Sequence, residues 1–99
     1  MGSNVLGTNG LSTNVRLLLT DGSVGSAFFF AGNGISIVRQ GEHVGELSQV
    51  ELDALTRMEQ AGDRVANRVA ELLTPYELTD ESRLNLTLSA REWIQAHAL

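Results

Sequence analysis

Hydrophobic and polar residues alternate along the first half of the chain in short runs that predict β-strands. These runs are rich in β-branched and aromatic residues, and they lie at 15–20, 27–31, 35–39 and 43–47. Turn residues separate them, beginning with the pair Asp21-Gly22. Closely spaced runs joined by glycine-containing turns are typical of an antiparallel meander.

The hydrophobic period changes after residue 47. Ser48 and Glu51 have the spacing of a capping box, in which the serine hydroxyl and the glutamate each satisfy a free backbone amide. Apolar residues and one glycine then recur at three- and four-residue steps, which predicts one long helix: Leu55, Met58, Gly62, Val65, Val69 and Leu72. The Thr74-Pro75 pair predicts its end, because the residue before a proline avoids the helical region.

The last twenty residues have two interpretations. Leu84, Leu86 and Leu88 alternate with polar residues, which predicts a half-buried strand. A second capping box at 89–92 would then begin a short C-terminal helix. Alternatively, residues 79–96 form one continuous helix capped by Thr79. We expect the strand, so the predicted fold is α+β: a small antiparallel β-meander packed on one long helix, then a short strand and a C-terminal helix.

The beginning of the chain has no hydrophobic period. Residues 1–13 are rich in glycine, asparagine, serine and threonine, which predicts a flexible N-terminal arm. Residues 14–99 then form a single α+β domain, a size that fits one hydrophobic core. Met1-Gly2-Ser3 is as typical of an expression tag as of a native start.

Charge and composition narrow the classes of function. The net charge is −5 and all seven basic residues are arginine, so a phosphate backbone would be repelled and we expect no nucleic-acid partner. No apolar stretch approaches the roughly 18 residues of a membrane span, so we expect no membrane. The absence of cysteine fits a reducing compartment, and we expect a cytoplasmic protein, or a virion component if the chain is viral.

No catalytic or metal-binding motif stands out. His43 and His97 lack further ligands at the spacing of a metal site, and no Gly-x-Ser-x-Gly pattern marks a nucleophile. We therefore expect neither an enzyme nor a cofactor.

Three consecutive phenylalanines give the strongest functional indication. Side chains alternate along a strand, so Phe28 and Phe30 share one face and Phe29 points to the other. Either other elements of the chain cover both faces, or one face is a subunit interface. Trp93 in the last helix is likewise either a core residue or an interface residue. The predicted interface residues are Phe28, Phe29, Phe30 and Trp93.

Three arginines suggest a second kind of site. Arg57, Arg64 and Arg68 fall within roughly 40° of one another on the predicted long helix. Such a ridge would bind an acidic partner or an anionic ligand. Otherwise it is a solvated face with local ion pairs.

Before Arg39 the chain carries only two charged residues, Arg16 and Asp21, which indicates that something covers part of the sheet. We therefore expect a structural or assembly protein whose partners are itself or other proteins, in a homo-oligomer or a larger particle. A viral shell or tail component would have a similar architecture, and this suggestion rests on analogy alone. The alternative is a small regulatory binding module that uses the three arginines.

Overall fold

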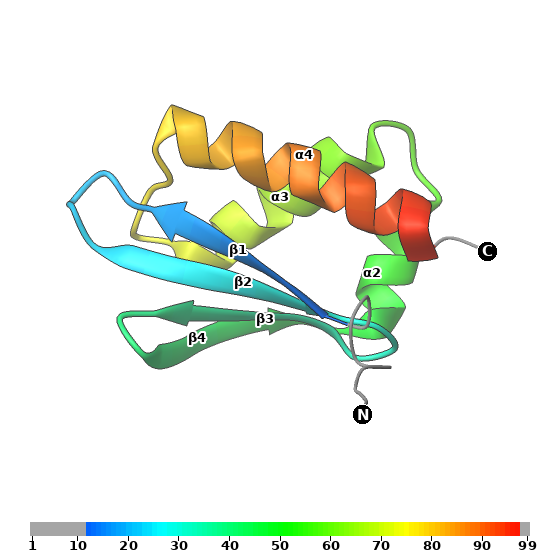
Figure 1. The fold of residues 1–99 in the computed structure, drawn as a ribbon, viewed down its shortest axis with the longest axis horizontal. Coiled ribbons are helices and arrows are strands. Elements are labelled where there is room, and N and C mark those ends of the chain that lie inside the picture. Colours follow the sequence, from blue (N-terminus) through cyan, green and yellow to red (C-terminus); the bar gives the residue numbers. More distant parts are fainter. Residues whose placement is uncertain (1–11, 98–99) are drawn as a thin grey trace, which may run out of the picture.

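Four antiparallel strands form a single sheet in the computed structural model, which describes residues 12–97 (Figure 1). The strands follow one another in space as they do in sequence. They are β1 (Ser12–Leu18), β2 (Val24–Phe30), β3 (Gly34–Arg39) and β4 (Glu42–Leu47). Each strand overlaps one of the predicted runs, so the antiparallel meander is confirmed.

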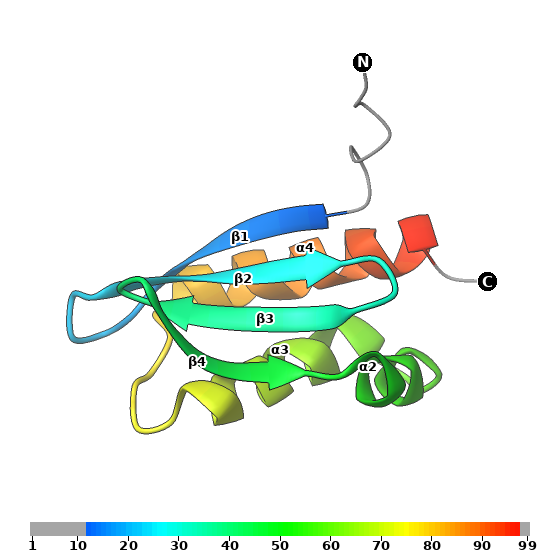
Figure 2. The same cartoon turned by 90° about the horizontal axis from the view of Figure 1, so that it is seen from below.

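Three helices follow the sheet: α2 (Gln49–Thr56), α3 (Ala61–Leu73) and α4 (Asp80–His97). Helices α3 and α4 cover one face of the sheet, which is seen in front of them when the molecule is turned, and α2 lies at the end of the sheet where β4 leads into it (Figure 2). The fold is therefore a two-layer α+β arrangement. No described helix or strand lies over the opposite face of the sheet.

The prediction of one long helix after Ser48 is wrong. The cap itself is present, since the Ser48 hydroxyl accepts a hydrogen bond from the Glu51 amide at 3.1 Å. The chain then leaves the helix after Thr56 and re-enters it at Ala61, with Gln60 in the left-handed region at φ 55°. An uninterrupted helix over this span would be about 37 Å long, whereas the six- and seven-residue strands extend only about 20–23 Å. The break keeps both segments against the sheet.

The strand predicted at Leu84, Leu86 and Leu88 is also wrong, because all three residues lie within α4. The continuous-helix alternative describes this region, and the Thr79 hydroxyl caps the helix by accepting from the Ser82 amide at 3.2 Å. The second capping box lies in the middle of α4 and begins no helix. Leu86 is fully buried while Leu84 and Leu88 are exposed. A strand would turn all three leucines to the same face, whereas a helix separates Leu86 from the other two.

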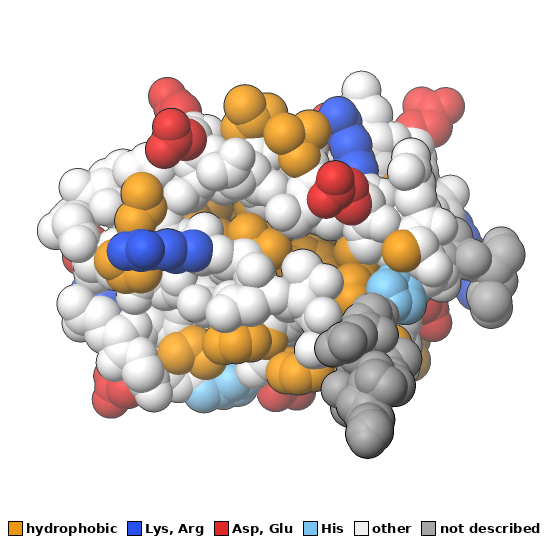
Figure 3. Space-filling view, in the orientation of Figure 1, with side chains coloured by type: hydrophobic (Ala, Val, Ile, Leu, Met, Phe, Trp, Pro, Cys, Tyr) orange, Lys and Arg blue, Asp and Glu red, His pale blue; other side chains and the backbone are white. Residues whose placement is uncertain are grey.

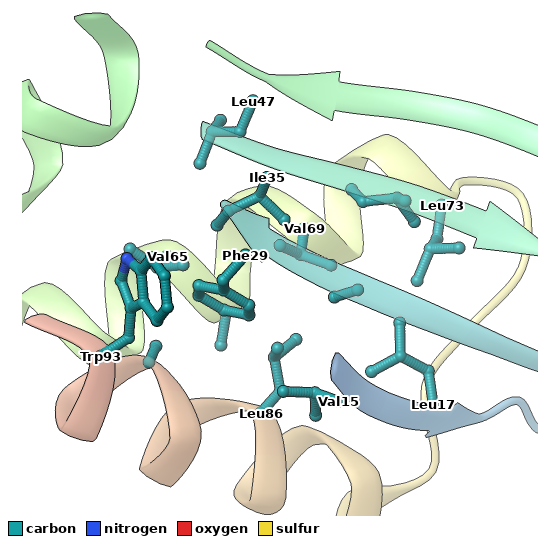
Figure 4. Packing of buried hydrophobic residues seen from close by; sticks show 14 of the residues in the cluster. Val15, Leu17, Phe29, Ile35, Leu47, Val65, Val69, Leu73, Leu86 and Trp93 are labelled. Atoms are coloured by element: carbon teal, nitrogen blue, oxygen red, sulfur yellow. The ribbon is translucent and has the colours of Figure 1, made fainter. Parts of the chain in front are cut away.

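The core lies between the sheet and the helices and is formed largely by aliphatic side chains (Figure 4). Phe29 and Trp93 supply its aromatic part, with ring centroids 5.6 Å apart and planes inclined at 53°. The buried members are Val15, Leu17, Leu19, Ala27, Phe29, Ile35, Ile37, Leu47, Leu52, Val65, Ala66, Val69, Leu73, Leu86, Ala90 and Trp93.

Gly62 lies where α3 approaches α4 closely. A β-carbon at this position would lie 2.5 Å from Arg91 Cγ and 3.0 Å from the carbonyl oxygen of Thr87. The apolar stripe of the sequence contains a glycine because a neighbouring helix of the same chain occupies the space of its side chain.

The predicted arm overlaps the sheet by two residues. Ser12 and Thr13 belong to β1, where they pair with Phe30 and Phe29. Residues 1–11 lie outside the part of the chain that the structure describes.

Candidate functional site

The face of the sheet that points away from the helices carries the candidate site, and we call it the open face. Strand alternation and the strand register place its residues: Asn14, Arg16, Leu18, Val24, Ser26, Phe28, Phe30, Ser36, Val38, His43 and Glu46. Their alternate neighbours on β1, β2 and β3 point into the core. In the space-filling view, hydrophobic side chains emerge along the side of the molecule that the sheet forms (Figure 3).

Phe28 and Phe30 are the largest side chains of the open face. Their rings stack with centroids 6.3 Å apart and an interplanar angle of 13°. Phe30 is 38% exposed and Phe28 is partly buried. The solvated face of an antiparallel sheet is normally polar, so a stacked phenylalanine pair at its surface is a feature that folding of this chain alone does not require.

Polar residues frame this aromatic pair. Arg16 lies on the edge strand β1, and His43 and Glu46 lie on the opposite edge strand, β4. His43 Nε2 is 3.6 Å from Glu46 Oε1. The open face therefore carries a cationic group at one edge and an anionic group at the other.

The four predicted interface residues divide between the two sides of the sheet. Phe28 and Phe30 lie on the open face, as the alternation predicted. Phe29 is 1% exposed and Trp93 is 7% exposed, and they pack against each other in the core. Trp93 also stacks on His97, with ring centroids 3.8 Å apart. Only the two outward phenylalanines are placed to contact another molecule.

The three predicted arginines do not form one ridge, because the helix that was to carry them is broken. Arg57 follows α2, whereas Arg64 and Arg68 lie in α3. Arg64 donates from Nε to the carbonyl oxygen of Glu59 at 2.8 Å.

Arg68 is engaged by two carboxylates. Its Nε is 2.6 Å from Glu51 Oε2, and its terminal nitrogen is 3.1 Å from Glu71 Oε1. Hydrogen bonding to Glu51, followed by the attraction of that charge, raises the pKa of Arg68. An external anion at Arg68 would have to compete with both carboxylates, which disfavours the alternative module.

Arg57 instead lines a cavity of about 450 Å³ between α2 and the end of α4. Asp53, Trp93 and His97 also line it. The Asp53 carboxylate accepts a hydrogen bond from Gln49 Nε2 at 2.8 Å, so it already has a partner within α2. Anion binding at Arg57 stays a prediction.

A cluster that the sequence did not reveal joins the first turn to the end of β3. Arg39 donates from Nε to Ser23 Oγ at 3.1 Å, lies 3.3 Å from Asp21 Oδ2, and stacks its guanidinium 3.7 Å above the centre of the Tyr76 ring. Hydrogen bonds from the Ser23 hydroxyl and amide, and then Arg39, lower the pKa of Asp21. The Asp-Gly-Ser pattern signals the turn, but nothing in the sequence signals Arg39 or Tyr76 as its partners.

Two other kinds of site are absent from residues 12–97. In that part of the chain no three histidine and acidic side chains come together in a way that could hold a metal ion. Nor does any helix there combine the length and apolar character that a membrane span requires.

Comparisons with known proteins give no family. A scan against protein-family models, a search of curated proteins and a search of solved structures each find no match. Proposals about function therefore depend on the geometry described above.

Proposed function

We propose that this protein is a non-enzymatic structural or assembly protein that acts through protein–protein contacts at the open face of its sheet, within a homo-oligomer or a larger particle. The observation that carries the proposal is the stacked Phe28–Phe30 pair on a sheet face that no described element covers. Removing a phenylalanine side chain from water contributes roughly 1.5–3 kcal/mol when burial is complete. Exposed apolar patches framed by polar residues commonly mark interaction surfaces.

The helical side of the molecule offers less for such a contact. Its exposed apolar side chains are scattered over separate elements: Val50 on α2, Met58 after it, and Leu84 and Leu88 on α4. Val50 and Met58 are isolated, as exposed hydrophobic residues of soluble proteins commonly are. Leu84 and Leu88 lie one helical turn apart and form a pair of exposed leucines. The open face differs because its apolar group contains the stacked phenylalanine pair and extends over neighbouring strands.

The test is the solution mass of two variants measured by light scattering. We expect the wild-type chain to form a defined oligomer, and the double variant F28S/F30S to be a folded monomer because its contact surface has become polar. The matched control is V50S, which removes an 80% exposed valine from α2 and should leave the oligomer intact. A wild-type chain that is monomeric at several hundred micromolar, or an oligomer that F28S/F30S leaves unchanged, would overturn the proposal.

A further inference from the structure

We propose that the open face binds a second copy of this chain, related by a two-fold axis that runs parallel to the strands between β2 and β3. This inference rests on the proposed function and specifies its partner. Two sheets that pack face to face keep their strand directions within about 30° and lie about 10 Å apart. A two-fold contact is self-complementary, so one surface must supply both halves of every interaction.

The sizes of the central side chains make the open face self-complementary. The strand register forms two rows across the middle of the open face, one containing Phe28 beside Ser36 and the other containing Ser26 beside Val38. Each row thus has one large and one small side chain, on opposite central strands. The proposed axis lays β2 on the β3 of the second copy, which sets every large side chain over a serine.

The charges at the two edges of the sheet are self-complementary as well. The same axis lays β1 on the β4 of the second copy. Because this axis preserves the rows, Arg16 of each copy lies over His43 of the other. The Glu46 carboxylate, 3.6 Å from that imidazole, supplies the negative charge that Arg16 approaches. A two-fold axis perpendicular to the strands would lay β1 on β1 and β4 on β4. It would bring like charges together, which disfavours association.

Association through the edges of the sheet is opposed by the chain itself. At the end of β1, the Leu18 amide donates to Ser82 Oγ at 2.8 Å and the Leu18 carbonyl accepts from the Thr79 amide at 2.9 Å. At the other edge, the register of β4 shifts opposite Ile37/Val38, and the strand carries charged residues. Hydrogen bonds to other segments, bulges and edge charges all hinder the addition of another strand.

The test is a charge-exchange experiment read by sedimentation velocity with the full chain. The variants are R16E, E46R, the double variant R16E/E46R, and an equimolar mixture of the two single variants. In R16E the edges of both copies become acidic, and in E46R both become basic, so each single variant should raise the dimer dissociation constant by at least about tenfold. The double variant and the mixture restore opposite charges at both contacts, and each should dimerise within about threefold of the wild type.

Controls separate the contact from net charge and from folding. R64E and E92R make the same charge changes on the helical side, at exposed residues, and should leave the dissociation constant unchanged. Circular dichroism verifies that each variant is folded.

A dimer that R16E and E46R do not weaken, or a mixture that is no tighter than its components, would overturn this arrangement while leaving the proposed function standing. A wild-type chain without any dimer would instead contradict the proposed function itself.

Discussion

Phe29 and Phe30 are adjacent in sequence, yet they should respond very differently to truncation. The perturbation is a single phenylalanine-to-alanine change at each position, F29A and F30A. Phe29 is 1% exposed and packs against Trp93, whereas Phe30 is 38% exposed and stacks on Phe28 across the open face. The comparison therefore measures which side of the sheet holds the core, with the chemical change held constant.

The two magnitudes follow from burial. Replacing a fully buried phenylalanine with alanine typically costs about 3–5 kcal/mol, because transfer free energy is lost and a cavity remains. A domain of this size has a total stability of about 5–15 kcal/mol, so F29A should remove at least about a fifth of it. F30A loses mainly the ring stacking and part of its burial, and should cost about 1 kcal/mol.

The assay is urea unfolding at low micromolar concentration, where self-association contributes least. Far-UV circular dichroism reports the transition, since F29A alters the surroundings of the single tryptophan. A cost for F30A equal to that for F29A, or a cost for F29A below about 1 kcal/mol, would refute the assignment of the two faces.

Three further changes test the helical layer and the first turn. The variant G62A should lower the free energy of unfolding by about 1–3 kcal/mol, despite the better helix propensity of alanine, because its β-carbon would press on Arg91; a gain in stability on chemical denaturation would contradict the close approach of α3 and α4. T79A should cost about 1 kcal/mol by removing the cap of α4, and an unchanged denaturation midpoint would show that the cap contributes nothing. The pKa of Asp21 is lowered in the folded state from its usual 3.8, chiefly by the Ser23 hydroxyl, so its stabilising contribution is present at neutral pH and is lost as the pH falls below about 4. D21A should therefore lose stability at pH 7 and show a shallower decline between pH 5 and pH 2, and a decline parallel to the wild type would count against this linkage.

The strands could be predicted because alternation, turn residues and β-propensity agreed over each run. The opposite orientation of Phe29 relative to Phe28 and Phe30 followed from the same periodicity, and the burial of Phe29 confirms it. What the pattern left open was which face the helices would cover, because that choice depends on tertiary packing.

The helices were predicted less well for two physical reasons. The apolar stripe continues through the break after Thr56, so periodicity alone does not reveal the break. Hydrophobic periodicity does not depend on the length of the sheet on which a helix packs. Around Leu86, the apolar–polar alternation of the sequence does not follow burial, because the helix buries Leu86 and leaves Leu84 and Leu88 exposed. For the first region the sequence gave only the single-helix prediction, and for the second it left a strand and a helix open; long-range packing decides both.

The residues of the candidate surface could likewise be predicted only in part. Sequence singled out the phenylalanine triplet but assigned interface residues to both faces, including Trp93, which the structure places in the core. Arg16, His43 and Glu46 were not singled out together, since only the strand register shows that they frame one face.

The most direct test of the central claim is the mass of the wild-type full chain by sedimentation equilibrium from about 1 to several hundred micromolar. We expect the mass to rise with concentration from 10.7 kDa to at least twice that value, because the open faces of two copies cover each other. A mass that stays at 10.7 kDa over the whole range would contradict it.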